Sequence, residues 1–174
     1  MKIKRAFPVI IGLLLVLSVF VSCEFAYSSQ LDATKKWVDK YVSVMYDEIK
    51  KYEGKTIAEA NEMADEVSDS IDQKKEKYAD EKYPYDSNKT MRDVVIEYSD
   101  YKDNVLYYYV AVPIPEDDKD VAETLAEEKG DQYYVIGLIT VKMDKAIEGH
   151  SEDELTIDKV TKKVYVSAKL PDEE

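Results

Sequence analysis

Apolar residues recur at three- and four-residue steps in the part of the chain that follows residue 30, a spacing typical of amphipathic helices. The stretch Leu31–Glu53 is one predicted helix, and Gly54 is expected to end it because glycine readily adopts the left-handed conformation found at helix ends. Thr56 and Glu59 have the spacing of a capping box, so a second helix is predicted to begin there and to fray over Lys74–Asp80. Because the link between the two helices is short, we expect an antiparallel helical hairpin.

In the second half of the chain apolar and polar residues alternate, which predicts strands. The predicted strands are Val94–Tyr101, Val105–Ile114, Tyr133–Met143 and a last one near Lys163–Leu170, after a short extended segment at Leu155–Ile157. The link Lys102-Asp103-Asn104 suits a tight hairpin, Asp117–Lys129 has the pattern of a short helix, and Tyr85–Thr90 is expected to be a polar loop. This order predicts an α+β fold, in which an N-terminal helical hairpin is followed by a four-stranded antiparallel sheet with one short inserted helix, in one domain over residues 31–174.

Alternation also assigns the strand side chains to two faces of the predicted sheet. The expected core face consists of Val94, Ile96, Tyr98, Leu106, Tyr108, Val110, Val112, Val164, Val166 and Ala168. The opposite face is expected to carry Tyr101, Tyr107, Tyr109 and Tyr165, with Tyr133 or Tyr134 nearby. Tyrosine offers a flat ring and a hydroxyl, so such a face could stack on a sugar or hold a peptide. The alternative is that tyrosine is simply a good strand former that tolerates half-exposure, or that the inserted helix covers these rings.

The N-terminal segment has the pattern of an export signal. Three basic residues, Lys2, Lys4 and Arg5, precede the uncharged and mostly apolar run Ala6–Ser22. As a helix this run is about 25 Å long, which is short of the roughly 30 Å hydrocarbon core of a bilayer. The run is therefore better suited to a signal than to a permanent membrane span.

The chain's single cysteine stands where the apolar run ends. Phe20-Val21-Ser22-Cys23 resembles the lipobox of bacterial lipoproteins, although Phe20 replaces the usual leucine. The resemblance implies that residues 1–22 are a cleaved signal peptide and that Cys23 carries the lipid. A short tether over residues 23–30 would then join the domain to the extracytoplasmic face of the cell membrane. The alternatives are that Cys23 is a chance thiol in an uncleaved anchor or in an ordinary signal peptide.

Charge and composition exclude several classes of function. Lysine and arginine number 24 against 37 aspartates and glutamates, which gives a net charge of −13. No nucleic acid partner is expected, because the chain could not neutralise a run of phosphates. Removing residues 1–22 removes three positive charges and no negative ones, so the net charge becomes −16. With one histidine and one cysteine, the chain also lacks the ligands for a His/Cys metal site.

Few residues fit catalytic chemistry. The only histidine, His150, lies in the acidic loop Asp144–Glu154, a poor place for a positioned base. Asp86 begins an EF-hand-like spacing of oxygen ligands, but Met91 replaces the glycine that such a loop requires, so no metal or other cofactor is predicted. Carboxylates are abundant, and no pair of them stands out from the background.

We therefore expect a membrane-anchored extracytoplasmic lipoprotein that acts as a binding module for an envelope protein or a glycan. Its candidate binding residues are the four tyrosines named above, and Cys23 is the candidate lipidation site. Two other classes remain open at this stage. One is an envelope hydrolase that uses carboxylates, which would need two buried acids with raised pKa values. The other is an acidic, ion-binding structural protein of the surface.

Overall fold

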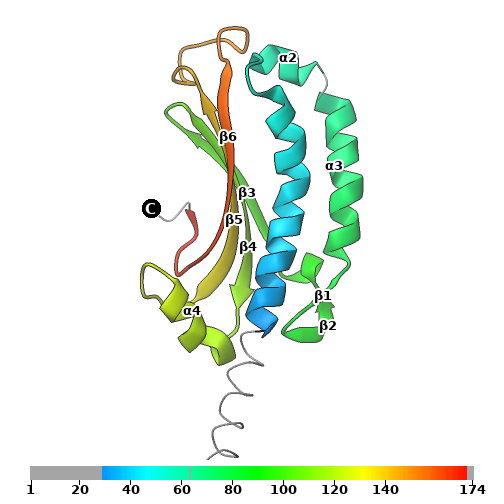
Figure 1. Cartoon of the computed structure of the whole chain (residues 1–174), viewed down its shortest axis with the longest axis vertical. Coiled ribbons are helices and arrows are strands. Elements are labelled where there is room, and N and C mark those ends of the chain that lie inside the picture. The colour runs from blue at the N-terminus through cyan, green and yellow to red at the C-terminus, as the bar shows by residue number, and fades with distance from the viewer. Residues whose placement is uncertain (1–28, 63, 172–174) are drawn as a thin grey trace, which may run out of the picture.

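The computed structural model describes residues 29–62 and 64–171. A long helix covers residues 29–49 and tightens into a 3-10 turn at Lys50–Tyr52. It is followed by α2 (Ile57–Asn61), α3 (Ala64–Ala79), β1 (Lys82–Tyr83), β2 (Asp86–Thr90), a 3-10 turn at Met91–Asp93, β3 (Ile96–Lys102), β4 (Val105–Ile114), a 3-10 turn at Glu116–Asp118, α4 (Lys119–Leu125), β5 (Tyr133–Met143) and β6 (Ile157–Ser167). The predicted α+β fold is confirmed (Figure 1).

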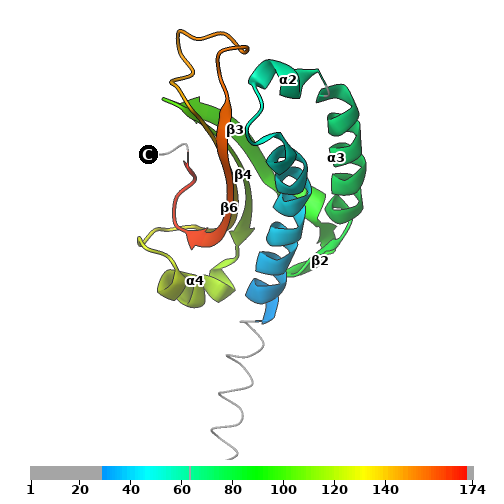
Figure 2. The ribbon, with the colours of Figure 1, turned by 45° about the horizontal axis from the view of Figure 1, so that its top comes forward.

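The four long strands form an antiparallel meander in the order β3-β4-β5-β6. Helix 29–49 lies on one face of this sheet, and α3 runs beside that helix on the side away from β6 (Figures 1 and 2). The predicted capping box is present, since the Thr56 hydroxyl accepts from the Glu59 amide and the Glu59 carboxylate accepts from the Thr56 amide. Gly54, with φ of +82°, ends the preceding turn in the left-handed conformation. None of the helices in the described part of the chain is long and apolar enough to cross a bilayer.

The second helix differs from its prediction in two ways. It is divided into α2 and α3, and α3 continues to Ala79 instead of fraying from Lys74. Tertiary contacts explain the added length. The Trp37 indole N–H donates to the Tyr78 carbonyl at 2.9 Å, and Ala79 is buried. Packing against helix 29–49 therefore stabilises a last turn whose own sequence is mostly polar.

The segment Tyr85–Thr90, which was expected to be a polar loop, contains strand β2, and β2 pairs with β1 in a small two-stranded sheet. Its five-residue strand β2 is polar and mostly exposed. The flanking residues Tyr83 and Met91 are buried and join the core. The hairpin is thus stabilised by buried residues at its ends. The sequence of β2 itself has no apolar alternation that would have predicted a strand.

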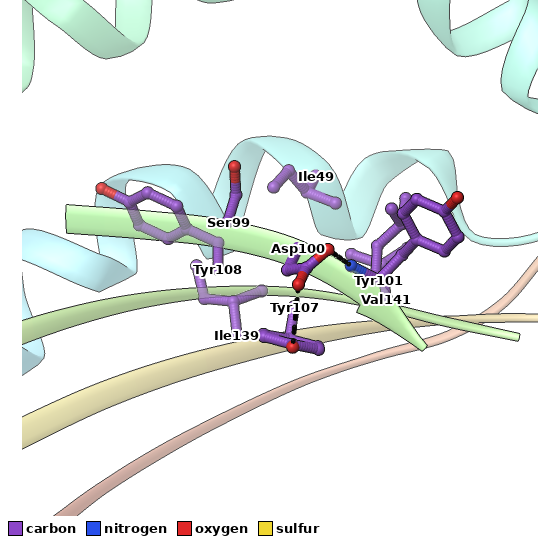
Figure 3. A pocket seen from close by; sticks show the side chains of 9 residues that line it. Ile49, Ser99, Asp100, Tyr101, Tyr107, Tyr108, Ile139 and Val141 are labelled. Carbon is purple, nitrogen blue, oxygen red and sulfur yellow. Dashed lines mark hydrogen bonds between the residues drawn. The ribbon is translucent and has the colours of Figure 1, made fainter. Parts of the chain in front are cut away.

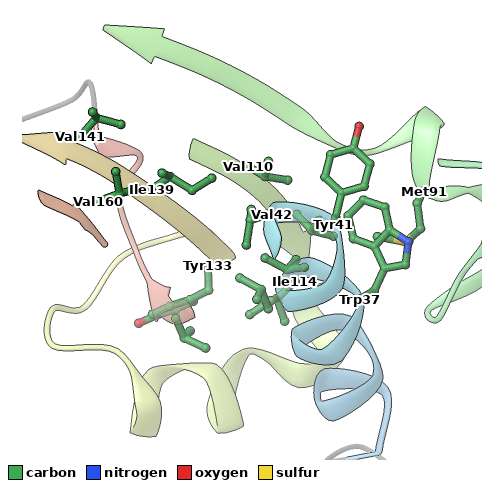
Figure 4. Packing of buried hydrophobic residues seen from close by; sticks show 14 of the residues in the cluster. Trp37, Tyr41, Val42, Met91, Val110, Ile114, Tyr133, Ile139, Val141 and Val160 are labelled. Atoms are coloured by element: carbon green, nitrogen blue, oxygen red, sulfur yellow. The ribbon is translucent and has the colours of Figure 1, made fainter. Parts of the chain in front are cut away.

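The main core lies between the sheet and helix 29–49 (Figure 4). The helix lies close to the sheet at Gly137 on β5, where an added Cβ would come within 2.7 Å of the methyl groups of both Val38 and Val42. Glycine at this position lets the helix lie directly on the sheet. Other buried members of this core include Trp37, Tyr41, Val110, Ile114, Tyr133 and Ile139.

The face assignment predicted for β3 was wrong. Lys102 pairs directly with Val105, so the turn consists of Asp103 and Asn104 alone, with Asp103 at φ +56°. With a two-residue turn, odd-numbered residues of one strand pair with even-numbered residues of the other. With the three-residue link assumed from the sequence, even-numbered residues would pair with even-numbered ones. Ile96 and Tyr98 consequently lie on the face opposite the helix, and Tyr101 lies on the helix face across from Leu106.

The last strand is longer at its start than predicted, because β6 begins at Ile157 and continues without a break to Ser167. Val164 and Val166 lie on the helix face as expected, opposite Gly137 and Val135. Beyond Ser167 the chain leaves the sheet, and Leu170 packs on the outer face against the small second core of Tyr109, Ala111 and Ile136.

Candidate functional site

The predicted tyrosine face is only partly assembled. Tyr107, Tyr109 and Tyr165 do lie on one face of the sheet, because Tyr107 pairs with Thr140, Tyr109 with Leu138, and Ile136 with Tyr165. Tyr109 is 1% exposed, so its ring is a core element and not a contact surface. Tyr101 lies on the other face, and Tyr107 and Tyr165 are half-buried.

The two tyrosines at the start of β5 also separate. Tyr134 packs on the outer face with the second core, whereas Tyr133 is buried in the main core. The Gly130 amide donates to the Tyr133 hydroxyl at 3.1 Å. A broad tyrosine platform is therefore not formed by the side chains that the sequence pattern selected.

The structure instead opens a groove on the helix face of the sheet, which we call the helix-side groove. It consists of two neighbouring hollows of about 370 and 330 Å³ that share Ile49 and Tyr108. The apolar and aromatic lining of the larger hollow is Ile49, Tyr101, Leu106, Tyr107, Tyr108, Ile139 and Val141, and Ser99 and Asp100 complete it (Figure 3). The apolar lining of the smaller one is Met45, Ile49, Tyr52, Ala60, Ile71, Tyr108 and Ile157.

The end of the β3–β4 hairpin gives this groove its open rim. Tyr101 is 47% exposed and Leu106 is 36% exposed, although both side chains point to the helix face. Ile49 stands in the last turn of the long helix, above the sheet residues Ile139 and Val141 (Figure 3). A contiguous apolar surface that water can reach is typical of a binding site.

Beside the groove, one carboxylate gathers three hydrogen-bond donors. Glu97 on β3 accepts from the Tyr41 hydroxyl at 2.5 Å, from the Lys75 ammonium at 2.6 Å, and from the Tyr108 hydroxyl. Lys75 on α3 also donates to the Tyr108 hydroxyl at 3.2 Å and lies over the rings of Tyr41 and Tyr108. We call these four residues the Glu97 cluster. It joins the helix, α3 and the sheet at the groove.

The pKa values in this cluster follow from its contacts. Burial raises the pKa of Tyr41 and of Tyr108, and the hydrogen bonds to the Glu97 carboxylate raise them further. Burial by itself favours the protonated form of Glu97, but the hydrogen bonds from Lys75, Tyr108 and Tyr41 outweigh it and lower the pKa of that carboxyl group. Glu97 is therefore ionised and both tyrosines are neutral at ordinary pH.

A further hollow lies on the other side of β3. It measures about 360 Å³ and is lined by Tyr98, Asp100, Lys102, Tyr107, Leu138, Thr140 and Pro171. Asp100 accepts from the Tyr101 amide at 2.8 Å and from the hydroxyls of Tyr98 and Tyr107 at 3.3 and 3.5 Å. We call this the outer hollow. Strand β3 thus lies between a largely apolar groove and a hollow of mixed polarity, and Asp100 and Tyr107 line both.

The described residues offer little for catalysis or metal binding. His150 lies in an exposed loop, with its Nδ1 2.9 Å from the Ala146 carbonyl. Over residues 29–62 and 64–171, no group of three or more acidic, histidine or cysteine side chains is placed to hold a metal ion. Cys23 lies outside the described residues.

Sequence reasoning missed Ile49, Lys75 and Glu97 as site residues. Ile49 follows the helical core pattern, and Lys75 lies in a segment expected to fray. Glu97 could have been identified had the turn been read as two residues, because a glutamate on the inward face of a strand needs a partner. Comparison with protein-family models, curated proteins and solved structures found no match.

Proposed function

We propose that this chain is a lipid-anchored binding protein of the cell envelope that holds the apolar part of a partner in the helix-side groove. The groove is the observation that carries the proposal. Its two hollows have the volume and apolar lining of ligand sites, and exposed Tyr101 and Leu106 continue the lining to the surface. The tyrosines of the opposite face contribute less, because Tyr109 is buried.

The anchor part of the proposal rests on the lipobox resemblance at Phe20–Cys23. Ser29 and Gln30, which were expected to belong to the tether, are already helical. A lipid on Cys23 would therefore keep the Ser29 end of the helix close to the bilayer. Ile49 lies about 30 Å further along the helix, at about 1.5 Å per residue. The groove would lie at the end of the helix that is further from the membrane, and the charge of −16 would keep the domain off anionic lipid headgroups.

Binding is favoured over hydrolysis by the state of Glu97, the carboxylate beside the groove. A carboxylate hydrolase needs an acid with a raised pKa at the site. Glu97 has a lowered pKa and is already engaged by Lys75 and two tyrosines. Among the described residues, burial raises the pKa of the Asp118 carboxyl group. Asp118 lies at the start of α4 and lines neither hollow of the groove.

A neutral fluorescent probe tests the groove directly. Nile red is titrated into the chain that lacks residues 1–22 and carries Cys23→Ala. Ile49→Trp fills both hollows and is expected to abolish the fluorescence gain. Leu125→Trp is the matched control, because Leu125 is 49% exposed on α4 and lines neither hollow. Equal probe binding by the Ile49→Trp variant and the parent chain would overturn the groove as the binding site.

The anchor is tested separately with the full chain. Expression in a bacterial host with radiolabelled palmitate is expected to label the parent chain and to leave Cys23→Ala unlabelled. Labelling of both proteins, or of neither, would contradict lipidation at Cys23 and would leave the result of the probe titration intact.

A further inference from the structure

The outer edge of β3 presents backbone hydrogen-bonding groups that do not bond to β4. In a hairpin closed by a two-residue turn, the closing residues Lys102 and Val105 form a hydrogen-bonded pair, and the bonded positions then alternate along the strand. Lys102 and Asp100 therefore bond to β4, while the amides and carbonyls of Ser99 and Tyr101 point away from it. The Tyr101 amide confirms this direction, because it bonds to the Asp100 carboxylate and not to β4.

The opposite edge of the sheet is closed at the start of β6. The Gly54 amide donates to the Ile157 carbonyl at 2.8 Å, and the Ile157 amide donates to the Lys55 carbonyl at 2.9 Å. The Val160 amide donates to the Glu53 carboxylate at 2.6 Å. In contrast, all seven residues of β3 are exposed. An open strand edge of this kind is a template for a further strand.

We propose that an extended peptide segment of a partner protein adds to the β3 edge as an antiparallel strand, which deepens the proposed binding function and rests on it. In strand addition, main-chain hydrogen bonds provide affinity and pockets for alternate side chains provide specificity. Such pockets flank β3 on both faces. Ser99, Asp100 and Tyr101 border the helix-side groove, and Tyr98, Asp100 and Lys102 border the outer hollow, so Asp100 belongs to both.

The two pockets define the partner's side chains. Residues of the added strand that pair with Ser99 and Tyr101 point to the helix face, where the groove takes apolar side chains. The residue between them points to the outer face beside the Asp100 carboxylate, which favours a basic side chain. Lys102, at the hairpin end, disfavours a second basic residue there. The partner segment is therefore apolar–basic–apolar, in keeping with the net charge of −13.

A blocked and labelled Thr-Val-Lys-Val-Thr peptide is the probe, measured by fluorescence anisotropy with the full chain in detergent micelles. Ser99→Pro removes an outward amide at an edge position that tolerates proline, and is expected to weaken binding about tenfold or more. Ser99→Thr keeps the amide and is expected to bind like the parent chain. Replacing the peptide lysine by glutamate is also expected to weaken binding.

Peptide N-methylation gives a test that does not depend on any variant of the protein. Methyl groups on both valine amides, which face β3, are expected to abolish binding, whereas a methyl on the lysine amide, which faces solvent, is expected to leave it unchanged. Equal binding of the two methylated peptides would overturn strand addition. So would a dimer in sedimentation that Ser99→Pro dissociates, because a second copy would then occupy the β3 edge.

These outcomes are separable from failure of the proposed function. Ser99→Pro is expected to keep Nile red binding in the groove while it loses the peptide. If Ser99→Pro retains full peptide affinity and Ile49→Trp loses both probes, strand addition is wrong and the groove remains the binding site. If Ile49→Trp loses neither probe, the groove itself is wrong.

Discussion

Glu97→Gln is expected to weaken the junction between the helices and the sheet. The substitution keeps the size of the side chain but removes the charge that Lys75 and the hydroxyls of Tyr41 and Tyr108 share. The Lys75 side chain is 16% exposed, so its ammonium group would be left largely buried with no other ion pair described for it. An uncompensated, mostly buried charge is among the more costly defects in a folded protein.

These contacts set the size of the expected effect. A hydrogen bond to a charged group contributes about 1.5–3 kcal/mol, and breaking a fully buried ion pair costs about 3–5 kcal/mol. The Glu97 side chain is 31% exposed, so water screens part of this interaction. We expect the free energy of unfolding at pH 7 to fall by about 2 kcal/mol.

The pH dependence has a defined sign. Because the pKa of Glu97 is lowered in the folded protein, the unfolded chain binds more protons between the two pKa values. The stabilisation is therefore fully present above the unfolded pKa of about 4.3 and is lost as the pH falls through the folded value. The difference between the parent chain and Glu97→Gln should shrink as the pH falls from 7 to 3.

Urea unfolding followed by far-UV circular dichroism measures this difference at both pH values. Glu148→Gln is the control, because Glu148 is an exposed loop residue whose charge change is the same. A loss below about 0.5 kcal/mol at pH 7, which is typical of a surface substitution, would refute the reasoning. A loss that is unchanged at pH 3 would show that the effect is not due to the ionised carboxylate.

Two further predictions concern the core. Gly137→Ala should lower the free energy of unfolding, measured in urea, by about 1–3 kcal/mol, because the new methyl group meets Val38 and Val42. Adding Val42→Ala should recover part of this loss. A Gly137→Ala variant as stable as the parent chain would contradict the close packing. Asp118 is fully buried, and only its Oδ2 is hydrogen-bonded, by the Tyr85 hydroxyl. Burial raises the pKa of this carboxyl group in the folded protein. Its contribution to stability is therefore lost as the pH rises from the pKa of the unfolded chain to the higher pKa of the folded protein. Asp118→Asn should therefore raise the melting temperature at pH 7 relative to the parent chain and give a smaller gain near pH 4, and a gain that grows on acidification would contradict this assignment.

The fold was predictable because its signals are local. Helical periodicity, the Thr56–Glu59 capping box and the Gly54 stop are all contained within a few residues, and they define the helical hairpin. The alternation in β4 and β5 is long enough to identify both strands without knowledge of their neighbours. These patterns are sufficient for the fold class.

The candidate site was less predictable because it depends on register and on distant contacts. A one-residue difference in the length of the β3–β4 turn moved Tyr98 and Tyr101 to opposite faces from those expected. The Glu97–Lys75 pair joins β3 to a helix that precedes it, and nothing local to either residue indicates the other. The groove itself depends on where the last turn of helix 29–49 lies above the sheet, which is a tertiary property.

The attachment of residues 53–57 to the start of β6 has a consequence for the order of folding. These contacts join segments about a hundred residues apart, whereas each pair of neighbouring strands in the meander is adjacent in the sequence. Closing so large a loop costs more entropy than closing a hairpin, so the meander can form before the attachment does. Because β6 follows the other described strands in the sequence, the helical layer cannot be fastened at that end until β6 itself has been synthesised. Pulsed hydrogen exchange during refolding should therefore show protection of the Gly54 amide later than that of the β4 amides.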